Sequence, residues 1–279
     1  MESQDYIPET ARITEIRPLS TDTSLFRLDL SSPPVKDSFL FNPGQFFQLT
    51  LPAVGEAPFT PACAGLERGK VDFCIRRVGH VTRVLHGLEE GSLVGLRGPF
   101  GNGFPMEQFA GCNILLLAGG LGIAPIRSLL LALLENRGRF GSITLMYGAR
   151  ELGLMLFREE LMSLSRHGQF RLMLTVDFAP QNGVGEVVCN VGLLPELLKG
   201  AGVDVRQACA VLCGPPGMYG CLISSLLDLG FPADCLFLSL ERRMKCGVGR
   251  CCHCVVDKRF CCVDGPVFRY SEIMGGWDR

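Results

Sequence analysis

The chain has 279 residues, of which 47% are hydrophobic and 20% charged, and 27 basic against 28 acidic residues leave a formal net charge of −1. This is a globular composition, and the balanced charge argues against a nucleic-acid surface or an acidic tail. The apolar runs fall well short of the roughly 20 residues of a membrane span, and the acidic N-terminus lacks signal-peptide features, so we expect a cytoplasmic protein.

The first part of the chain, residues 1–108, predicts a β domain. Short β-rich runs recur there between turn residues, which is typical of a small barrel or sandwich. The expected strands are Ala11–Ile16, Leu25–Leu30, Gln45–Leu51, Val71–Arg76 and Ser92–Leu96, with one helical interruption at His80–Leu88.

The second part, residues 109–238, predicts an α/β domain, because strand-like and helix-like segments alternate. Such alternation implies parallel strands that are buried under helices on both faces. The expected strands are Asn113–Ala118, Ile143–Tyr147, Phe170–Val176, a strand ending at Val211–Cys213, and Cys235–Ser239; the expected helices are Pro125–Asn136, Leu154–Ser165 and Tyr219–Leu229.

A glycine-rich turn follows the first of these strands, with Gly119, Gly120 and Gly122 leading into a helix that has Pro125 in its first turn. Main-chain amides and a helix N-terminus at such a turn make an anion site suited to a pyrophosphate. The turn is not the G-x-G-x-x-G motif, and glycines also serve simple tight turns. A second glycine-rich turn, Cys213–Met218, lies at the carboxyl end of a later strand, the edge where ligands bind to open parallel sheets.

The segment after Ile143–Tyr147 bears on the choice of nucleotide. Arg150 would suit a ribose 2′-phosphate, whereas the neighbouring Glu151 would suit a free 2′-hydroxyl. The sequence therefore leaves NAD and NADP open, with a slight preference for NAD.

The last part, residues 239–279, is rich in cysteine and has too little apolar content for a core of its own. Cys246, Cys251 and Cys254 have the C-x4-C-x2-C spacing of plant-type ferredoxins, which predicts a [2Fe–2S] cluster. A fourth thiolate is required, and Cys261 and Cys262 are the candidates. A zinc site and unligated buried cysteines are the alternatives.

Taken together, these segments resemble the ferredoxin–NADP reductase superfamily, and within it the gamma-type subunits of hydrogenase, sulfur reductase and anaerobic sulfite reductase. The electron-transfer subunit of dihydroorotate dehydrogenase is a similar relative. The blocks that carry the resemblance are Gly44–Phe46, Glu56–Thr60, Gly79–Thr82, Arg97–Gly101, Gly119–Pro125, Cys213–Met218, Ser239–Gly247 and Cys262–Phe268.

The resemblance implies a flavin-binding β-barrel, an NAD(P)-binding domain and a C-terminal [2Fe–2S] module. It places Pro58, Phe59 and Thr60 at the isoalloxazine of FAD, Gly79, His80, Val81 and Thr82 at its phosphates, and Cys213 near the nicotinamide, with Gly214 and Met218 in the same motif. It also nominates Cys262 over Cys261 as the fourth ligand, and in an extended segment these two neighbours would point to opposite sides.

One position departs from the family pattern, because Ala57 stands where many relatives have an arginine that binds the flavin pyrophosphate. Arg76, Arg77 or Arg83 are the candidates to replace that charge. Ordinary exposed arginines on a solvated face are the alternative interpretation.

We therefore predict an NAD(P)H-dependent oxidoreductase that passes electrons through FAD and the cluster to partner redox subunits of the hydrogenase, sulfite or sulfur reductase, or heterodisulfide-reductase type. No side chain is assigned to acid–base catalysis, because the cofactors carry the chemistry. A stand-alone flavin reductase, a dihydroorotate dehydrogenase electron-transfer subunit and a zinc-stapled binding module are the alternatives.

Overall fold

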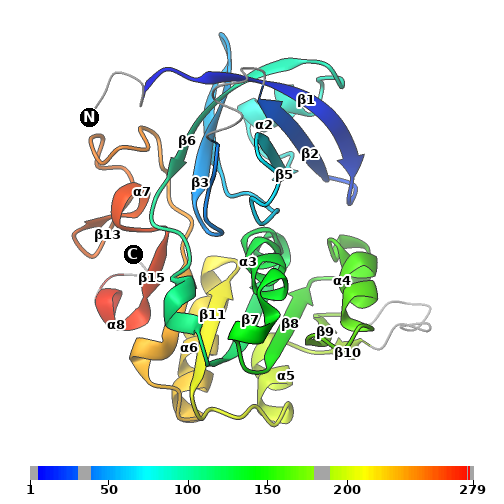
Figure 1. Ribbon diagram of the computed structural model, residues 1–279, viewed down its shortest axis with the longest axis vertical. Helices are drawn as coiled ribbons and strands as arrows, with labels where there is room; N and C mark the ends of the chain where they lie inside the picture. Colours follow the sequence, from blue (N-terminus) through cyan, green and yellow to red (C-terminus); the bar gives the residue numbers. More distant parts are fainter. Residues whose placement is uncertain (1–5, 31–38, 179–188, 275, 277–279) are drawn as a thin grey trace.

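The computed structural model describes residues 6–30, 39–178, 189–274 and 276. In Figure 1 the chain forms a β-barrel, a second domain built on a parallel sheet, and a small C-terminal module beside both. Among the described residues, no helix combines the length and the apolar content that crossing a bilayer requires.

Six antiparallel strands in the order β4-β3-β6-β1-β2-β5 form the barrel. Its interior is apolar, with Phe26, Phe47 and Phe73 fully buried. A bridge between Pro61 and Phe73 links the end of β4 to β5 and closes the barrel. The bounds are β1 (Glu9–Pro18), β2 (Thr23–Leu30), β3 (Phe46–Leu51), β4 (Gly55–Phe59), β5 (Lys70–Arg76), β6 (Leu93–Phe100) and, for the helix, α2 (His80–Leu85).

The predicted strands and helix of the barrel are confirmed, but strand β4 was missed. Its Pro58 lacks a main-chain donor, which argues against a central strand. The structure resolves the conflict because β4 lies at the end of the strand order and pairs only with β3 in the ladder.

The second domain has a seven-stranded sheet in the order β10-β9-β8-β7-β11-β12-β15. The strands from β7 to β12 are all parallel, as predicted. Their bounds and those of the helices are β7 (Asn113–Gly119), α3 (Ile123–Glu135), β8 (Ile143–Ala149), α4 (Arg158–Ser165), β9 (Arg171–Val176), β10 (Asn190–Val191), α5 (Leu194–Gly200), β11 (Ala208–Cys213), α6 (Pro216–Asp228) and β12 (Leu236–Ser239), with short 3-10 turns η2 (Met106–Phe109), η3 (Gly120–Gly122), η4 (Arg137–Arg139), η5 (Leu152–Leu154) and η6 (Ala233–Cys235).

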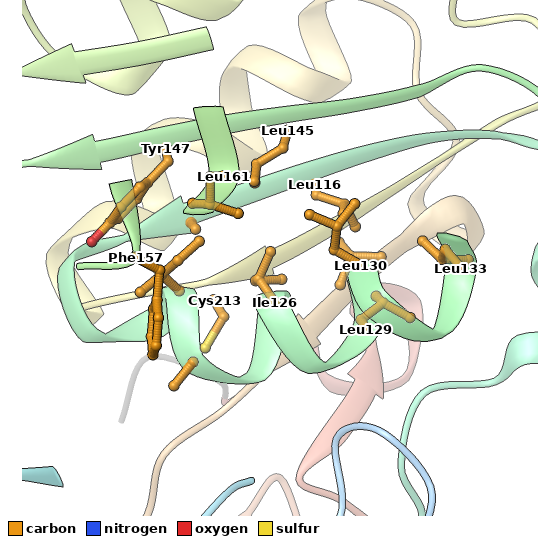
Figure 2. Packing of buried hydrophobic residues seen from close by; sticks show 14 of the residues in the cluster. Leu116, Ile126, Leu129, Leu130, Leu133, Leu145, Tyr147, Phe157, Leu161 and Cys213 are labelled. Carbon is orange, nitrogen blue, oxygen red and sulfur yellow. The ribbon is translucent and has the colours of Figure 1, made fainter. Parts of the chain in front are cut away.

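Helices cover both faces of this sheet, so its strands are buried on both sides. Figure 2 shows the side chains of Ile126 and Leu130 in α3 pointing toward Leu116 and Leu145 of the sheet. Helices α5 and α6 pack in a separate buried cluster with the opposite set of strand residues. Helix α5 was not predicted from the sequence.

The C-terminal module contributes a strand to this sheet. Strand β15 (Val267–Arg269) pairs antiparallel with β12, and its Phe268 is buried in the same cluster as Leu212 and Leu238. The module thus packs its buried residues into the core of the second domain, in agreement with the low apolar content of residues 239–279. Its other elements are β13 (Val255–Val256), β14 (Arg259–Phe260), α7 (Cys261–Asp264) and α8 (Tyr270–Ile273).

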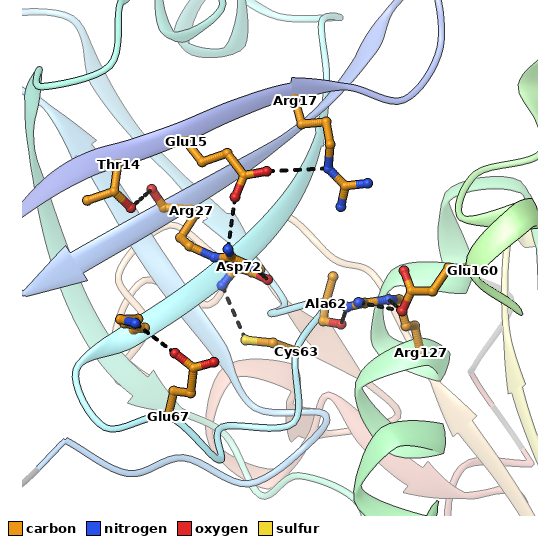
Figure 3. Close-up of polar contacts among 11 residues, drawn as sticks. Thr14, Glu15, Arg17, Arg27, Ala62, Cys63, Glu67, Asp72, Arg127 and Glu160 are labelled. Atoms are coloured by element: carbon orange, nitrogen blue, oxygen red, sulfur yellow. Dashed lines mark hydrogen bonds and ion pairs between the residues drawn. The ribbon is translucent and has the colours of Figure 1, made fainter. Parts of the chain in front are cut away.

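Helix α3 also fastens the barrel to the second domain (Figure 3). Arg127 forms an ion pair with Glu160 of α4, stacks over the ring of Phe157, and donates to the carbonyl oxygen of Ala62 in the barrel. The neighbouring Ser128 hydroxyl donates to the carbonyl of Cys63 at 2.6 Å. These contacts fix how the two domains face each other across the cavity described next.

Candidate functional site

A central cavity of about 250 Å³ lies between the barrel, the start of α3 and the segment after β12. Three of the residues on its wall, Phe59, Thr82 and Cys213, come from three of the predicted motifs. The fold therefore brings together segments that the sequence reasoning treated separately. The predicted residues that line this cavity are Pro58, Phe59, Thr60, Thr82, Pro125 and Cys213.

Thr82 reaches this cavity from inside its helix. Its hydroxyl oxygen accepts hydrogen bonds from the amides of Val78 and Gly79 at 3.0 and 2.8 Å and donates to the carbonyl of Gly79. The Gly79 amide, which was expected to face the phosphates, is thus engaged locally. As at any helix N-terminus, the next amides, those of His80 and Val81, have no acceptor within the helix.

The cavity wall also contains Glu241, which was not assigned from the sequence, and Arg76, one of the three arginines considered in place of the family's arginine at Ala57. Glu241 directly follows the end of β12 and lines the cavity. Burial raises the pKa of its carboxyl, against the opposing charge of Arg76. Arg76 itself lines the cavity, whereas the guanidinium of Arg83 donates to the carbonyl of Val78.

Replacing Glu241 by glutamine is expected to stabilise the protein at neutral pH. Because the pKa of Glu241 is raised in the folded state, the folded state binds the Glu241 proton more tightly than the unfolded state does. The contribution of Glu241 to stability is therefore fully present below pH 4.5 and is lost as the pH rises through the raised pKa. The thermal midpoint of E241Q should match wild type in acid and exceed it at about pH 8. The exposed control E89Q should follow wild type throughout, and a lower midpoint for E241Q at the higher pH would contradict the assignment.

A second cavity of about 370 Å³ opens at the carboxyl ends of β7, β8, β9 and β11. Both glycine-rich turns reach it, as expected for an open parallel sheet. The side chain of Met218 packs against both turns. A Cβ added at Gly119 would lie 2.5 Å from the Met218 sulfur, and one added at Gly214 would overlap the Met218 methyl group. The predicted residues that line this cavity are Gly119, Gly120, Arg150 and Met218.

Asp177, which the sequence reasoning missed, also lines the second cavity. It directly follows strand β9, and its amide donates to the carbonyl of Ala149 at 3.1 Å. The rule that ligands meet the carboxyl ends of strands would have found it, since Phe170–Val176 was already an expected strand. Arg150 and Asp177 thus offer opposite charges to whatever occupies this cavity.

Gly122 lies where the two glycine-rich turns meet. A Cβ at this position would overlap the carbonyl group of Cys213 and lie 2.7 Å from the amide nitrogen of Gly214. The Cys213 thiol is 1% exposed, and burial raises its pKa. Helix α3 begins directly after Gly122, which confirms that Pro125 lies in the first helical turn.

Residues 246–262, called the cysteine loop below, follow the central cavity directly along the chain. Met244 lies on the cavity wall, and Cys246 stands two residues later. The sulfur of Cys246 accepts hydrogen bonds from the amides of Arg250 and Cys251 at 3.3 and 3.5 Å. The backbone of the loop turns at Gly247 and Gly249, with φ of +79° and +71°.

The four predicted cysteines lie in two pairs. The thiol of Cys251 is within hydrogen-bonding reach of Cys246, and that of Cys262 is within reach of Cys254. Hydrogen bonding by the amide of His253 lowers the pKa of Cys251 to about 7, whereas burial raises that of Cys262 to about 12. Among the described residues, no three His, Cys, Asp or Glu side chains converge tightly enough to hold a single metal ion.

Cys261 and Cys262 point in different directions, although not for the reason given from the sequence. The segment is not extended, because the two residues form the first turn of α7. The Cys262 sulfur accepts the amide of Gly249 at 3.2 Å, whereas the Cys261 sulfur lies 3.6 Å from the carbonyl oxygen of Leu240. Only Cys262 therefore faces the glycine turns of the loop.

Three segments of the chain match known families. Residues 10–104 match the oxidoreductase FAD-binding domain, residues 116–222 the oxidoreductase NAD-binding domain, and residues 241–274 the iron-sulfur cluster binding domain of dihydroorotate dehydrogenase B. The three matches follow one another in the order of the barrel, the parallel sheet and the cysteine loop.

Whole-chain relatives give the same result. The chain is 39% identical to the sulfhydrogenase 2 subunit gamma of Pyrococcus furiosus over 277 residues, which cover 95% of each chain. It is 35% identical to the probable dihydroorotate dehydrogenase B (NAD(+)) electron transfer subunit of Methanocaldococcus jannaschii, over 94% of this chain and 89% of that one. Among solved structures, a chain from an NADH-dependent reduced ferredoxin-NADP oxidoreductase superimposes with a TM-score of 0.74 and 25% identity, covering 96% of this chain and 92% of that one.

Proposed function

The chain belongs to the ferredoxin–NADP reductase-like family of electron-transfer subunits that includes the sulfhydrogenase gamma and dihydroorotate dehydrogenase electron-transfer subunits, and on that basis we propose how its sites work in series. It passes electrons between NAD(P)H and a partner redox subunit through FAD and a [2Fe–2S] cluster. One observation carries the proposal: the wall of the central cavity contains Phe59 of the flavin block, Cys213 of the nicotinamide motif, and Met244, two residues before Cys246.

FAD fits the barrel side of the central cavity. Phe59 and Thr60 offer a ring and a hydroxyl to the isoalloxazine, and the amides of His80 and Val81 at the start of α2 are available to its phosphates. Of the three arginines considered as replacements for the missing arginine at Ala57, Arg76 lines the cavity and is the one we assign to the flavin phosphates.

NAD(P)H would fit the second cavity, and Cys213 on the wall of the central cavity would lie near its nicotinamide, as the family motif implies. Gly119 and Gly120 present main-chain amides to a pyrophosphate. Asp177 suits free ribose hydroxyls, whereas Arg150 suits a 2′-phosphate, and we retain the preference for NAD. Flavin, when bound, converts the two-electron chemistry of the nicotinamide to the one-electron chemistry of an iron–sulfur cluster.

The cysteine loop fits a [2Fe–2S] cluster held by Cys246, Cys251, Cys254 and Cys262. Such a cluster takes two protein ligands on each iron, and the contacts of Cys246 with Cys251 and of Cys254 with Cys262 support this proposal. Main-chain amides aimed at the sulfurs of Cys246 and Cys262 suit thiolate ligands.

The partner is a second redox subunit, as for the relatives of this chain, which are themselves subunits of larger complexes. These relatives are named as subunits of sulfhydrogenase and of dihydroorotate dehydrogenase B, and both kinds of partner are compatible with these sites. All fourteen cysteines are free, which suits the reducing cytoplasm that we expect. A stand-alone flavin reductase is the second candidate and differs only in lacking a partner.

Purification under anaerobic conditions tests the proposal. The chain is expected to contain about two iron atoms, two acid-labile sulfides and one FAD, and to reduce an artificial dye with NAD(P)H. Stoichiometric zinc without sulfide, or FMN in place of FAD, would contradict it. Co-purification of other redox subunits with the native protein separates the electron-transfer subunit from the stand-alone reductase.

A further inference from the structure

The cysteine loop is held from outside its own module by two strands of the barrel. The Nε2 of Gln48 in β3 donates to the carbonyl oxygen of Met244, 196 positions away, and approaches that of Lys245 at 3.4 Å. The guanidinium of Arg97 in β6 donates to the carbonyl of Cys246 from both terminal nitrogens, at 3.4 and 3.5 Å. The backbone from the cavity wall to the first cluster ligand is thus fixed by Gln48 and Arg97.

Arg97 is itself held by a two-pronged ion pair with Glu56 of β4. The Nε and Nη2 atoms of Arg97 lie 2.8 and 2.5 Å from the two carboxylate oxygens, and the side chains are 6% and 25% exposed. Burial acts to raise the pKa of Glu56, but hydrogen bonds from Arg97 and Thr50 outweigh it and lower that pKa. Both groups are therefore charged at neutral pH.

The ring of Phe100 lies beside both Arg97 and the glycine that follows Cys246. The guanidinium of Arg97 stacks 5.5 Å from the ring centre of Phe100, and a Cβ at Gly247 would lie 3.0 Å from that same ring. Phe100 in turn packs against Phe46, which lines the central cavity. Arg97 consequently lies beside a run of packed side chains, Phe46 and Phe100, that extends from the central cavity to the cysteine loop.

We propose that Arg97 is a positioning residue for the cluster, and that its charge, balanced by Glu56, sets the reduction potential of the cluster relative to the flavin. This inference rests on the proposed function, since it requires the cluster to be present. A buried ion pair is costly to desolvate and adds little to stability, so a role beyond holding the fold gives a reason for it.

The charges of Arg97 and Glu56 predict the direction in which each substitution shifts the reduction potential of the cluster. A purely structural role for the pair predicts no such difference in direction. Reduction adds a negative charge to the cluster, so a nearby cation raises its potential and a nearby anion lowers it. Arg97→Gln leaves the Glu56 carboxylate unbalanced and should lower the potential, whereas Glu56→Gln leaves the guanidinium unbalanced and should raise it. A pair that merely held the loop would, when broken from either side, disturb the cluster in the same way.

Anaerobic redox titration of the whole protein, followed by EPR of the reduced cluster, provides the test. We expect shifts in opposite directions, each about tenfold in the one-electron equilibrium constant, which is ~59 mV. Arg97→Lys, which keeps the charge, should stay close to wild type. A matched control is Arg27→Gln, which breaks the bidentate pair with Asp72 elsewhere on the barrel and should leave the potential unchanged.

The outcomes separate this inference from the proposed function. A wild-type protein without a cluster would refute the proposed function itself. A cluster whose potential is unchanged in both variants, or shifts in the same direction in both, would overturn the role of Arg97 alone. If Arg97→Gln fails to assemble the cluster, the Glu56→Gln measurement decides, since a raised potential supports the inference and an unchanged one overturns it.

Discussion

Replacing Cys262 by serine is expected to abolish the EPR signal of the reduced cluster and to leave at most a small fraction of the iron bound. The Cys262 side chain is 1% exposed, faces the thiol of Cys254 and accepts the amide of Gly249, so it completes the second pair of ligands. Loss of a ligand also removes folding energy, because ligation and folding of a small metal module are coupled. Limited proteolysis should therefore cut C262S within residues 240–274 more readily than wild type.

The neighbouring Cys261 provides a matched control in the same helical turn. Its sulfur faces the carbonyl of Leu240 and its side chain is fully buried, so C261S should keep the cluster and lose only about 1 kcal/mol of stability. A cluster lost in C261S but kept in C262S would move the assignment by one residue. Equal, mild effects in both would point to Cys252, which is exposed, as an alternative ligand.

Replacing Gly122 by alanine is expected to lower kcat/KM for NAD(P)H by at least about a hundredfold, since displacements of about 1 Å have effects of this size. The added methyl group would overlap the carbonyl of Cys213, which is backbone and cannot rotate away. The two glycine-rich turns would have to separate, and the nicotinamide position with them. Stopped-flow measurement of flavin reduction checks this, with flavin and cluster content measured on the same sample.

Gly217 is the control for this substitution, because it lies in helix α6 at the end of the second glycine-rich turn but has no atom near the position of a Cβ. Alanine there should leave flavin reduction within about threefold of wild type, since alanine favours a helix more than glycine does. Normal reduction in G122A would show that the turns do not need their close contact. Loss of flavin and cluster together in G122A would indicate a folding defect instead of a local one.

The sequence predicted the parts of the site that depend on local chemistry. The spacing of Cys246, Cys251 and Cys254 is visible in one line of sequence, and so is the strand–turn–helix pattern around Gly119. The structure confirms the barrel, the parallel sheet and most of their elements, because alternating apolar residues and glycine turns are local signals. The roles of the individual site residues stay predictions until the cofactors are measured.

Other features depend on distant segments and could not be predicted in this way. Arg97 appeared only as part of a barrel motif, because its contact with Cys246 spans 149 positions. A helical turn stands at Cys261 and Cys262 where the sequence analysis expects an extended segment, because four residues show no periodicity. The antiparallel strand β15 was missed because three residues with neighbours on another domain carry almost no strand signal of their own.

That last strand has a consequence for any attempt to separate the flavoprotein from the cluster. A fragment that ended before the cysteine loop would lose β15 and leave β12 as an open sheet edge with Leu236, Phe237 and Leu238 along it. An unpaired apolar edge invites pairing with another chain, so such a fragment should aggregate more readily than the whole chain. The cysteine module is therefore not a detachable appendage, because its strand covers one edge of the nucleotide-binding sheet.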